Sequence, residues 1–246
     1  MIRPGFASLA RVSGMAAVAV AVAGCSSTID RGRMQRDLAQ KDVQFTSRSV
    51  QEIEALRPQL EIPFRLAVAP PIWRDDAAWT REEREELEAF GKELREIGLV
   101  SEFVLIPSVT YEIGGGSAKG DWFGRLREAA ARHHADAVLV VRDIDDTSQW
   151  ANVLSVLDLT IVGCWFVPGH SAEALSIMQA LLIDNRNEYL YASAEGEGTA
   201  KDTQPFAYLD GDALRKEART AALRDLRADL SGKARDVMQA RASAAP

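Results

Sequence analysis

The chain has 246 residues, of which 29 are lysine or arginine and 36 are aspartate or glutamate, so its formal net charge is −7. This acidic balance excludes the electrostatic footprint of a nucleic-acid-binding protein, because such proteins neutralise phosphates with clustered basic side chains. Hydrophobic residues make up 47% of the chain, which is typical of a globular domain with a core of its own.

The N-terminal 24 residues have the pattern of a secretion signal. Arg3 and Arg11 precede or open a short apolar run that extends from Val12 to Ala23. A basic start followed by such a run is typical of a secretory signal, which the mature protein lacks. The run has about a dozen residues, whereas a membrane-spanning helix needs ~20. We therefore expect residues 1–24 to be removed and not to span a bilayer.

The end of this run, Val22-Ala-Gly24-Cys25, resembles the lipobox of bacterial lipoproteins. The resemblance implies cleavage between Gly24 and Cys25, a diacylglyceryl group on the sulfur of Cys25, and usually acylation of the new amine. Two or more acyl chains hold a protein stably at a membrane. Ser26 follows the cysteine. In the proteobacterial sorting rule, an aspartate at this position retains a lipoprotein at the inner membrane, whereas serine lets it move to the outer membrane. We therefore expect a lipid-anchored protein, at the periplasmic face of the outer membrane.

The mature chain is predicted to consist of a tether and one domain. Residues 25–60 are polar and mixed in charge, with thinly spread apolar residues, and we expect a tether that is helical in part. Residues 61–240 are predicted to form a single α/β domain. If Cys25 carries lipid, Cys164 is alone in an oxidising compartment, so no intrachain disulfide is expected.

The first half of the domain alternates strands with helices. Two helix boundaries are especially clear, because Thr80 and Glu83 form a capping box and Gly98 ends the helix that follows. The expected order is strand 64–70, a helix after Thr80, strand 102–106, a helix capped by Asp121, and strand 136–141. Such alternation favours parallel strands joined by right-handed crossovers.

The second half changes to longer strands. We expect a strand over 153–167, then strands 175–184 and 188–194 joined by the turn Asp184-Asn-Arg-Asn187. A final helix is expected over 210–240, with Gly232 as a point of interruption. The predicted fold class is therefore α/β (α+β), with a mixed sheet of about six strands packed by about three helices.

Four strings, in this order after a lipobox, are similar to the rhombotarget lipoproteins: Ile62–Ala69, Ile106–Gly116, Asp136–Val141 and Leu159–Gly169. That family is named for its association with rhombosortase protein-sorting systems and has no established catalytic residues. The resemblance therefore implies an envelope location and leaves activity open. The chain ends without a Gly-Gly and hydrophobic tail, so it is not expected to be a sorting substrate itself.

Catalytic motifs are absent from the sequence. The glycine-rich stretch 114–120 is followed by Asp121, which would repel a phosphate where a phosphate loop needs Lys-Ser/Thr. Neither Gly-x-Ser-x-Gly nor His-Glu-x-x-His occurs. His133 and His134 are neighbours that point in different directions on a helix, and Cys164 lies in an apolar strand. We assign no catalytic residue, cofactor or metal ligand.

One group of carboxylates supports an alternative function. Asp75 and Asp76 follow the first strand, and Asp143, Asp145 and Asp146 follow the third. Ligands of open α/β sheets bind beyond the carboxyl ends of parallel strands, and calcium or magnesium accepts such oxygen ligands. The alternative is therefore a periplasmic metal-dependent hydrolase that uses these five residues, whereas solvated loop acids are the ordinary interpretation.

Aromatic residues near the ends of two predicted strands are candidates for a contact surface. Trp165 and Phe166 end the predicted strand 153–167, and Trp73 and Trp79 follow the first strand. Such residues ordinarily fill the core, but an exposed Trp165 or Phe166 would mark a protein or lipid contact. The sequence thus favours a non-enzymatic accessory lipoprotein that is anchored through Cys25 and binds an envelope protein.

Overall fold

The computed structural model describes residues 29–40, 43, 45–71, 74, 78–112, 122–152, 165 and 168–244. The signal, Cys25, Asp75, Asp76, Phe166 and all but Trp165 of the predicted strand 153–167 lie outside these residues. The elements are α1 (Arg31–Gln40), α2 (Val50–Ala55), β1 (Phe64–Val68), α3 (Arg81–Glu96), β2 (Val100–Leu105), α4 (Ser108–Glu112), α5 (Trp122–Arg132), β3 (Ala137–Ala151), β4 (His170–Asp184), β5 (Leu190–Gln204), the 3-10 helix η2 (Phe206–Tyr208) and α7 (Gly211–Ala244).

The sheet is mixed, as predicted. Its five strands have the order β2-β1-β3-β4-β5. Strand β1 pairs in parallel with both β2 and β3, whereas β4 pairs antiparallel with β3 and with β5. The parallel part comes from the strand-helix alternation of the first half, and the turn after Asp184 joins the antiparallel pair β4 and β5.

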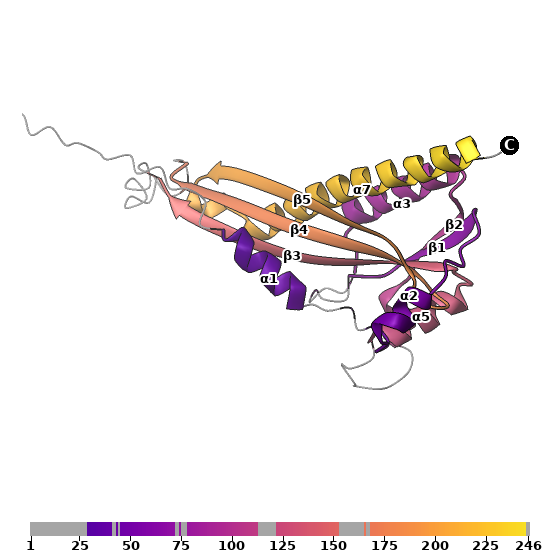
Figure 1. Ribbon diagram of the computed structural model, residues 1–246. Coiled ribbons are helices and arrows are strands. Elements are labelled where there is room, and N and C mark those ends of the chain that lie inside the picture. The colour runs from indigo at the N-terminus through magenta and orange to yellow at the C-terminus, as the bar shows by residue number, and fades with distance from the viewer. Residues whose placement is uncertain are drawn as a thin grey trace, which may run out of the picture.

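The three antiparallel strands are longer than expected and form an arm. Strand β1 pairs with β3 only up to Leu139, but β3 continues for twelve more residues, fully paired with β4. We call this extension the arm: residues 140–151, 170–181 and 193–204. Its tip is where Ala151, His170 and Gln204 lie side by side across the three strands. Figure 1 shows the arm projecting beyond β1 and β2.

Helices cover both faces of the sheet (Figure 1). Alternate side chains of β3 point to opposite faces, so Leu139 and Val141 pack with α3 and α7, while Val138 and Val140 pack with α5. Helix α3 begins at the predicted capping box, in which Thr80 and Glu83 bond each other's backbone, and Gly98 follows its end with a φ of 75°. Helix α7 continues through Gly232 without interruption.

The segment predicted to be a tether is helical in part, and its first helix also packs on the sheet. Met34 and Leu38 of α1 are buried against Leu175 and Ile177 of β4. Further along, Ser49 caps α2. Helix α1 therefore belongs to the folded body, which its thin apolar pattern did not indicate. No helix in the described part of the chain combines the length and the apolar character that crossing a membrane requires.

Candidate functional site

The three aspartates of the 143–146 region lie within β3 and not after it. Because neighbouring residues of a strand face opposite sides, Asp143 and Asp145 lie on the side of α3 and α7, and Asp146 lies on the side of α1. Arg33 of α1 donates to Asp146 at 2.5 Å. The alternative in which all five aspartates converge at one site is therefore wrong for Asp146, because strand alternation separates it from Asp143.

Asp143 is part of a buried ion cluster. Its Oδ2 accepts a hydrogen bond from Nε of Arg74 at 2.6 Å, and Nη1 of Arg74 donates to Oε2 of Glu83 at 2.9 Å. The three side chains are 5% exposed or less. Burial alone would lower the pKa of Arg74, but the carboxylates of Asp143 and Glu83 more than offset it and raise that pKa. The cluster joins the start of α3 to the middle of β3.

Asp145 has a different environment on the same face. It forms an ion pair with Arg215 of α7, at 3.8 Å. Burial raises the pKa of Asp145 above its usual value, with Arg219 acting against the rise and Asp143 adding to it. Within the described ranges, no group of three or more histidine, cysteine or acidic side chains could hold a metal ion. Asp143, Asp145 and Asp146 thus each form an ion pair with an arginine.

The three histidines lie at opposite ends of the long strands. His133 and His134 follow α5, beside the start of β3, whereas His170 begins β4 at the tip of the arm. They cannot share a site, because the full length of β3 separates them. Cys164, which the sequence predicts to lie in an apolar strand, is outside the described residues.

Two exposed aromatic residues, one before the start of β4 and one after the end of β5, form a pair. Trp165 is 48% exposed and lies edge-on to Tyr208, with ring centroids 5.9 Å apart. Tyr208 belongs to η2, directly after the end of β5, and is 55% exposed. Of the predicted aromatics, Trp79 is in the core at 7% exposure. Sequence reasoning missed Tyr208, because only the fold brings it beside Trp165.

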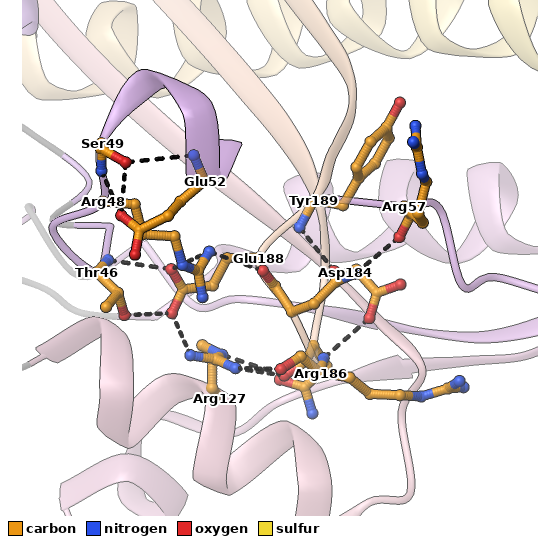
Figure 2. A network of polar contacts seen from close by, with 12 residues as sticks. Thr46, Arg48, Ser49, Glu52, Arg57, Arg127, Asp184, Arg186, Glu188 and Tyr189 are labelled. Atoms are coloured by element: carbon orange, nitrogen blue, oxygen red, sulfur yellow. Dashed lines mark hydrogen bonds and ion pairs between the residues drawn. The ribbon is translucent and has the colours of Figure 1, made fainter. Parts of the chain in front are cut away.

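A second polar network fixes the opposite end of β4 and β5 (Figure 2). Glu188, which is 4% exposed, accepts hydrogen bonds from the backbone and hydroxyl of Thr46 and an ion pair from Arg127 of α5. Arg127 also donates to the carbonyls of Asn185 and Arg186 in the predicted turn. These contacts hold the turn, α5 and the segment before α2 together, so the network is structural.

No family model and no curated protein matches the chain. Several solved bacterial proteins are similar in structure at low identity. The lipoprotein GNA1162 from Neisseria meningitidis has 16% identity and a TM-score of 0.35, over 62% of this chain and 90% of that one. The PelC dodecamer from Paraburkholderia phytofirmans has 16% identity and a TM-score of 0.30, over 69% and 92%.

A third similar structure is a minor lipoprotein from Acinetobacter baumannii, with 9% identity and a TM-score of 0.33, over 73% of this chain and 94% of that one. All three structures are thus similar to this chain at identities of 16% or less and TM-scores of 0.35 or less. The resemblance to the rhombotarget lipoproteins remains a prediction, since no family model matches.

Proposed function

We propose that this protein is a non-enzymatic accessory lipoprotein of the bacterial envelope, anchored through lipid on Cys25 and binding an envelope protein through Trp165 and Tyr208. The exposed aromatic pair is the observation that carries the proposal. Tryptophan and tyrosine are enriched at the centres of protein interfaces, where large rings are buried at low entropic cost. Phe166, which follows Trp165 in the sequence, is the third residue of the proposed contact.

The position of α1 supports an anchor near this surface. Arg31 and Arg33 of α1 pair with Glu197 and Asp146, so the helix begins on the arm. Four peptide steps separate Cys25 from Ile29, and they span at most ~14 Å. Asp146 lies five residues before the tip, which corresponds to ~17 Å of strand. The lipid and the aromatic pair can therefore reach the same membrane surface, where we place the partner.

We infer that the membrane is the outer one, at its periplasmic face, because serine follows Cys25. The similarity of four sequence strings to rhombotarget lipoproteins further supports a partner in a rhombosortase sorting system. The alternative of a metal-dependent hydrolase gains no support from the described residues, since the Asp143 carboxylate is held by Arg74 and Asp146 is on the other face.

Photocrosslinking in the native envelope tests the contact. Tyr208 is replaced by p-benzoylphenylalanine in the full chain, and adducts are identified by mass spectrometry. We expect a discrete adduct with one envelope protein, and at least about a fivefold loss of it when Trp165→Ala is added. In the matched control, p-benzoylphenylalanine replaces Val50 of α2, which is 66% exposed. This variant should give no such adduct.

Two outcomes would overturn the contact: adducts with lipid only, or adducts equal at positions 208 and 50. The anchor is tested separately with Cys25→Ala, which should release the protein from washed membranes. A Cys25→Ala chain that stays on washed membranes but keeps its crosslink would refute the anchor and leave the contact standing, so the two claims fail independently.

A further inference from the structure

An apolar cavity lies in the core at the end of the molecule opposite the arm. Its volume is about 280 Å³, and it is bounded by β1, β3, β4, β5, α3, α7 and the segment that precedes β1. Among the described residues that line it, every side chain is apolar except Tyr191 and Lys233. The cavity opens to solvent beside Val237, which is 50% exposed, and a ligand with an apolar part would be stabilised by covering this lining from water.

A second, separate void of about 10 Å³ shares Phe90, Leu139 and Leu230 with the cavity as lining residues. The void extends between α3 and α7 toward Leu223 and Leu226. A void of this size holds no part of a ligand, so the apolar part of any ligand must lie in the cavity of about 280 Å³.

The two polar side chains differ in what they offer. The hydroxyl of Tyr191 accepts hydrogen bonds from the backbone N–H groups of Gln59 and Leu60 and donates to Asp184. It is therefore committed to holding the segment that covers the cavity. Lys233 donates to the carbonyl of Ser193 and to Asp229, and an ammonium group has a third N–H to give.

The mouth carries positive charge on one face of α7. Lys233, Val237 and Arg241 are spaced four residues apart, so they lie on the same side of the helix. Arg241 donates to the carbonyl of Ile62, which lines the cavity, and Val237 is 50% exposed. Asp229 is the carboxylate that faces Lys233. Two cations and one anion at the opening favour an anionic head group outside an apolar interior.

We propose that this cavity binds the acyl chain of a single-chain anionic amphiphile, with the carboxylate or phosphate head group at Lys233 and Arg241. Such a ligand matches each feature of the site: an apolar chain for the interior, and an anion for the opening. A fatty acid and a lysophospholipid share this chemistry. The proposal does not depend on the anchor or on the aromatic pair.

Photoaffinity labelling of the full chain in its membrane tests the proposal. The probe is a twelve-carbon fatty acid with a diazirine at the end of its chain, and labelled positions are mapped by peptide mass spectrometry. We expect labels on Phe90, Leu139 or Leu230, at the deep end of the cavity. Competition with dodecanoate in one arm and with lysophosphatidylglycerol in the other distinguishes the two sources of the chain.

Three variants make the test specific. Ala234→Phe fills the cavity from α7 and should reduce labelling at least tenfold, whereas Ala228→Phe, on the exposed side of the same helix, should leave it unchanged. Lys233→Glu alters only the mouth and should weaken labelling about fivefold, which keeps the test decisive if Ala234→Phe does not fold. Labels confined to residues outside the lining, or equal labelling in Ala228→Phe and Lys233→Glu, would overturn the proposal.

Discussion

Arg74 lies within hydrogen-bond distance of two buried carboxylates, Asp143 at 2.6 Å and Glu83 at 2.9 Å, and it also lies over the ring of Trp79. The guanidinium fork suits this arrangement, because two of its N–H groups can serve different acceptors at once. Glu83 in turn accepts from the backbone of Thr80. A single side chain thus links the first turn of α3 to the strand that continues into the arm.

Replacing Arg74 tests the weight of this link. Arg74→Met removes the cation that pairs with two buried carboxylates, so we expect the free energy of unfolding to fall by about 3–5 kcal/mol. Urea denaturation of the purified protein measures the loss. Arg81→Met, at a side chain that is 82% exposed, should change stability by less than about 0.5 kcal/mol. Equal effects of the two substitutions would show that the cluster is not structural.

Asp145 predicts a pH dependence of stability with a definite sign. Burial raises its pKa in the folded protein above the usual 3.8. A carboxyl group with a raised folded pKa stabilises the fold below its unfolded pKa, and that contribution is lost as the pH rises through the folded value. Asp145→Asn should therefore be more stable than the parent at pH 7, and the difference should shrink as the pH falls toward 3.8. Denaturation at several pH values measures it, and a constant or inverted difference would contradict this assignment.

Glu188 provides a test at the opposite end of the long strands. Glu188→Ala removes the acceptor of Thr46 and the buried partner of Arg48 and Arg127, so we expect a loss of about 3 kcal/mol. Glu128→Ala is the control, because that side chain is 71% exposed and pairs only at 3.7 Å with Arg132. Thermal unfolding compares the two, and a shift for Glu128→Ala as large as that for Glu188→Ala would count against the network.

Two glycines distinguish close packing from helix propensity. A Cβ at Gly198 of β5 would lie 2.2 Å from backbone atoms of Ala218 and Ala222 in α7, whereas a Cβ at Gly232 meets nothing within 4 Å. Gly198→Ala should therefore cost about 3 kcal/mol by forcing α7 off the sheet. Gly232→Ala should instead stabilise by about 0.5–1 kcal/mol, because alanine favours the helix interior. Opposite signs in urea denaturation are the expected result, and a neutral Gly198→Ala would mean that α7 does not pack this closely.

Much of the fold could be predicted from the sequence, because the signals for helix ends and turns are local. The capping box of Thr80 and Glu83, the stop at Gly98 and the turn after Asp184 each depend on neighbours in the chain, and the structure confirms them. The lengths of β3 and β4 did not follow from the sequence, because polar residues such as Arg142 and Asp143 interrupt the apolar pattern. These polar residues of β3 are part of the sheet because their backbones pair with β4 along its whole length.

The candidate site was less predictable, because it depends on distant contacts. Arg74 and Glu83 meet Asp143 across 60 residues or more, and no spacing rule indicates that meeting. The apolar pattern predicts the end of the third strand before Asp143, whereas Asp146 lies within β3, where strand alternation turns it to the opposite face. The exposure of Trp165 was one of two outcomes considered, and the structure confirms it. Its neighbour Tyr208 was outside the reach of sequence patterns.

The claim on which the proposed function depends is that Cys25 is the lipid-bearing first residue of the mature protein. Intact mass spectrometry of the protein from its native membrane tests it directly. We predict a chain that lacks residues 1–24 and carries a diacylglyceryl group on the Cys25 sulfur. A chain that starts at Met1 with an unmodified Cys25 thiol would contradict the account.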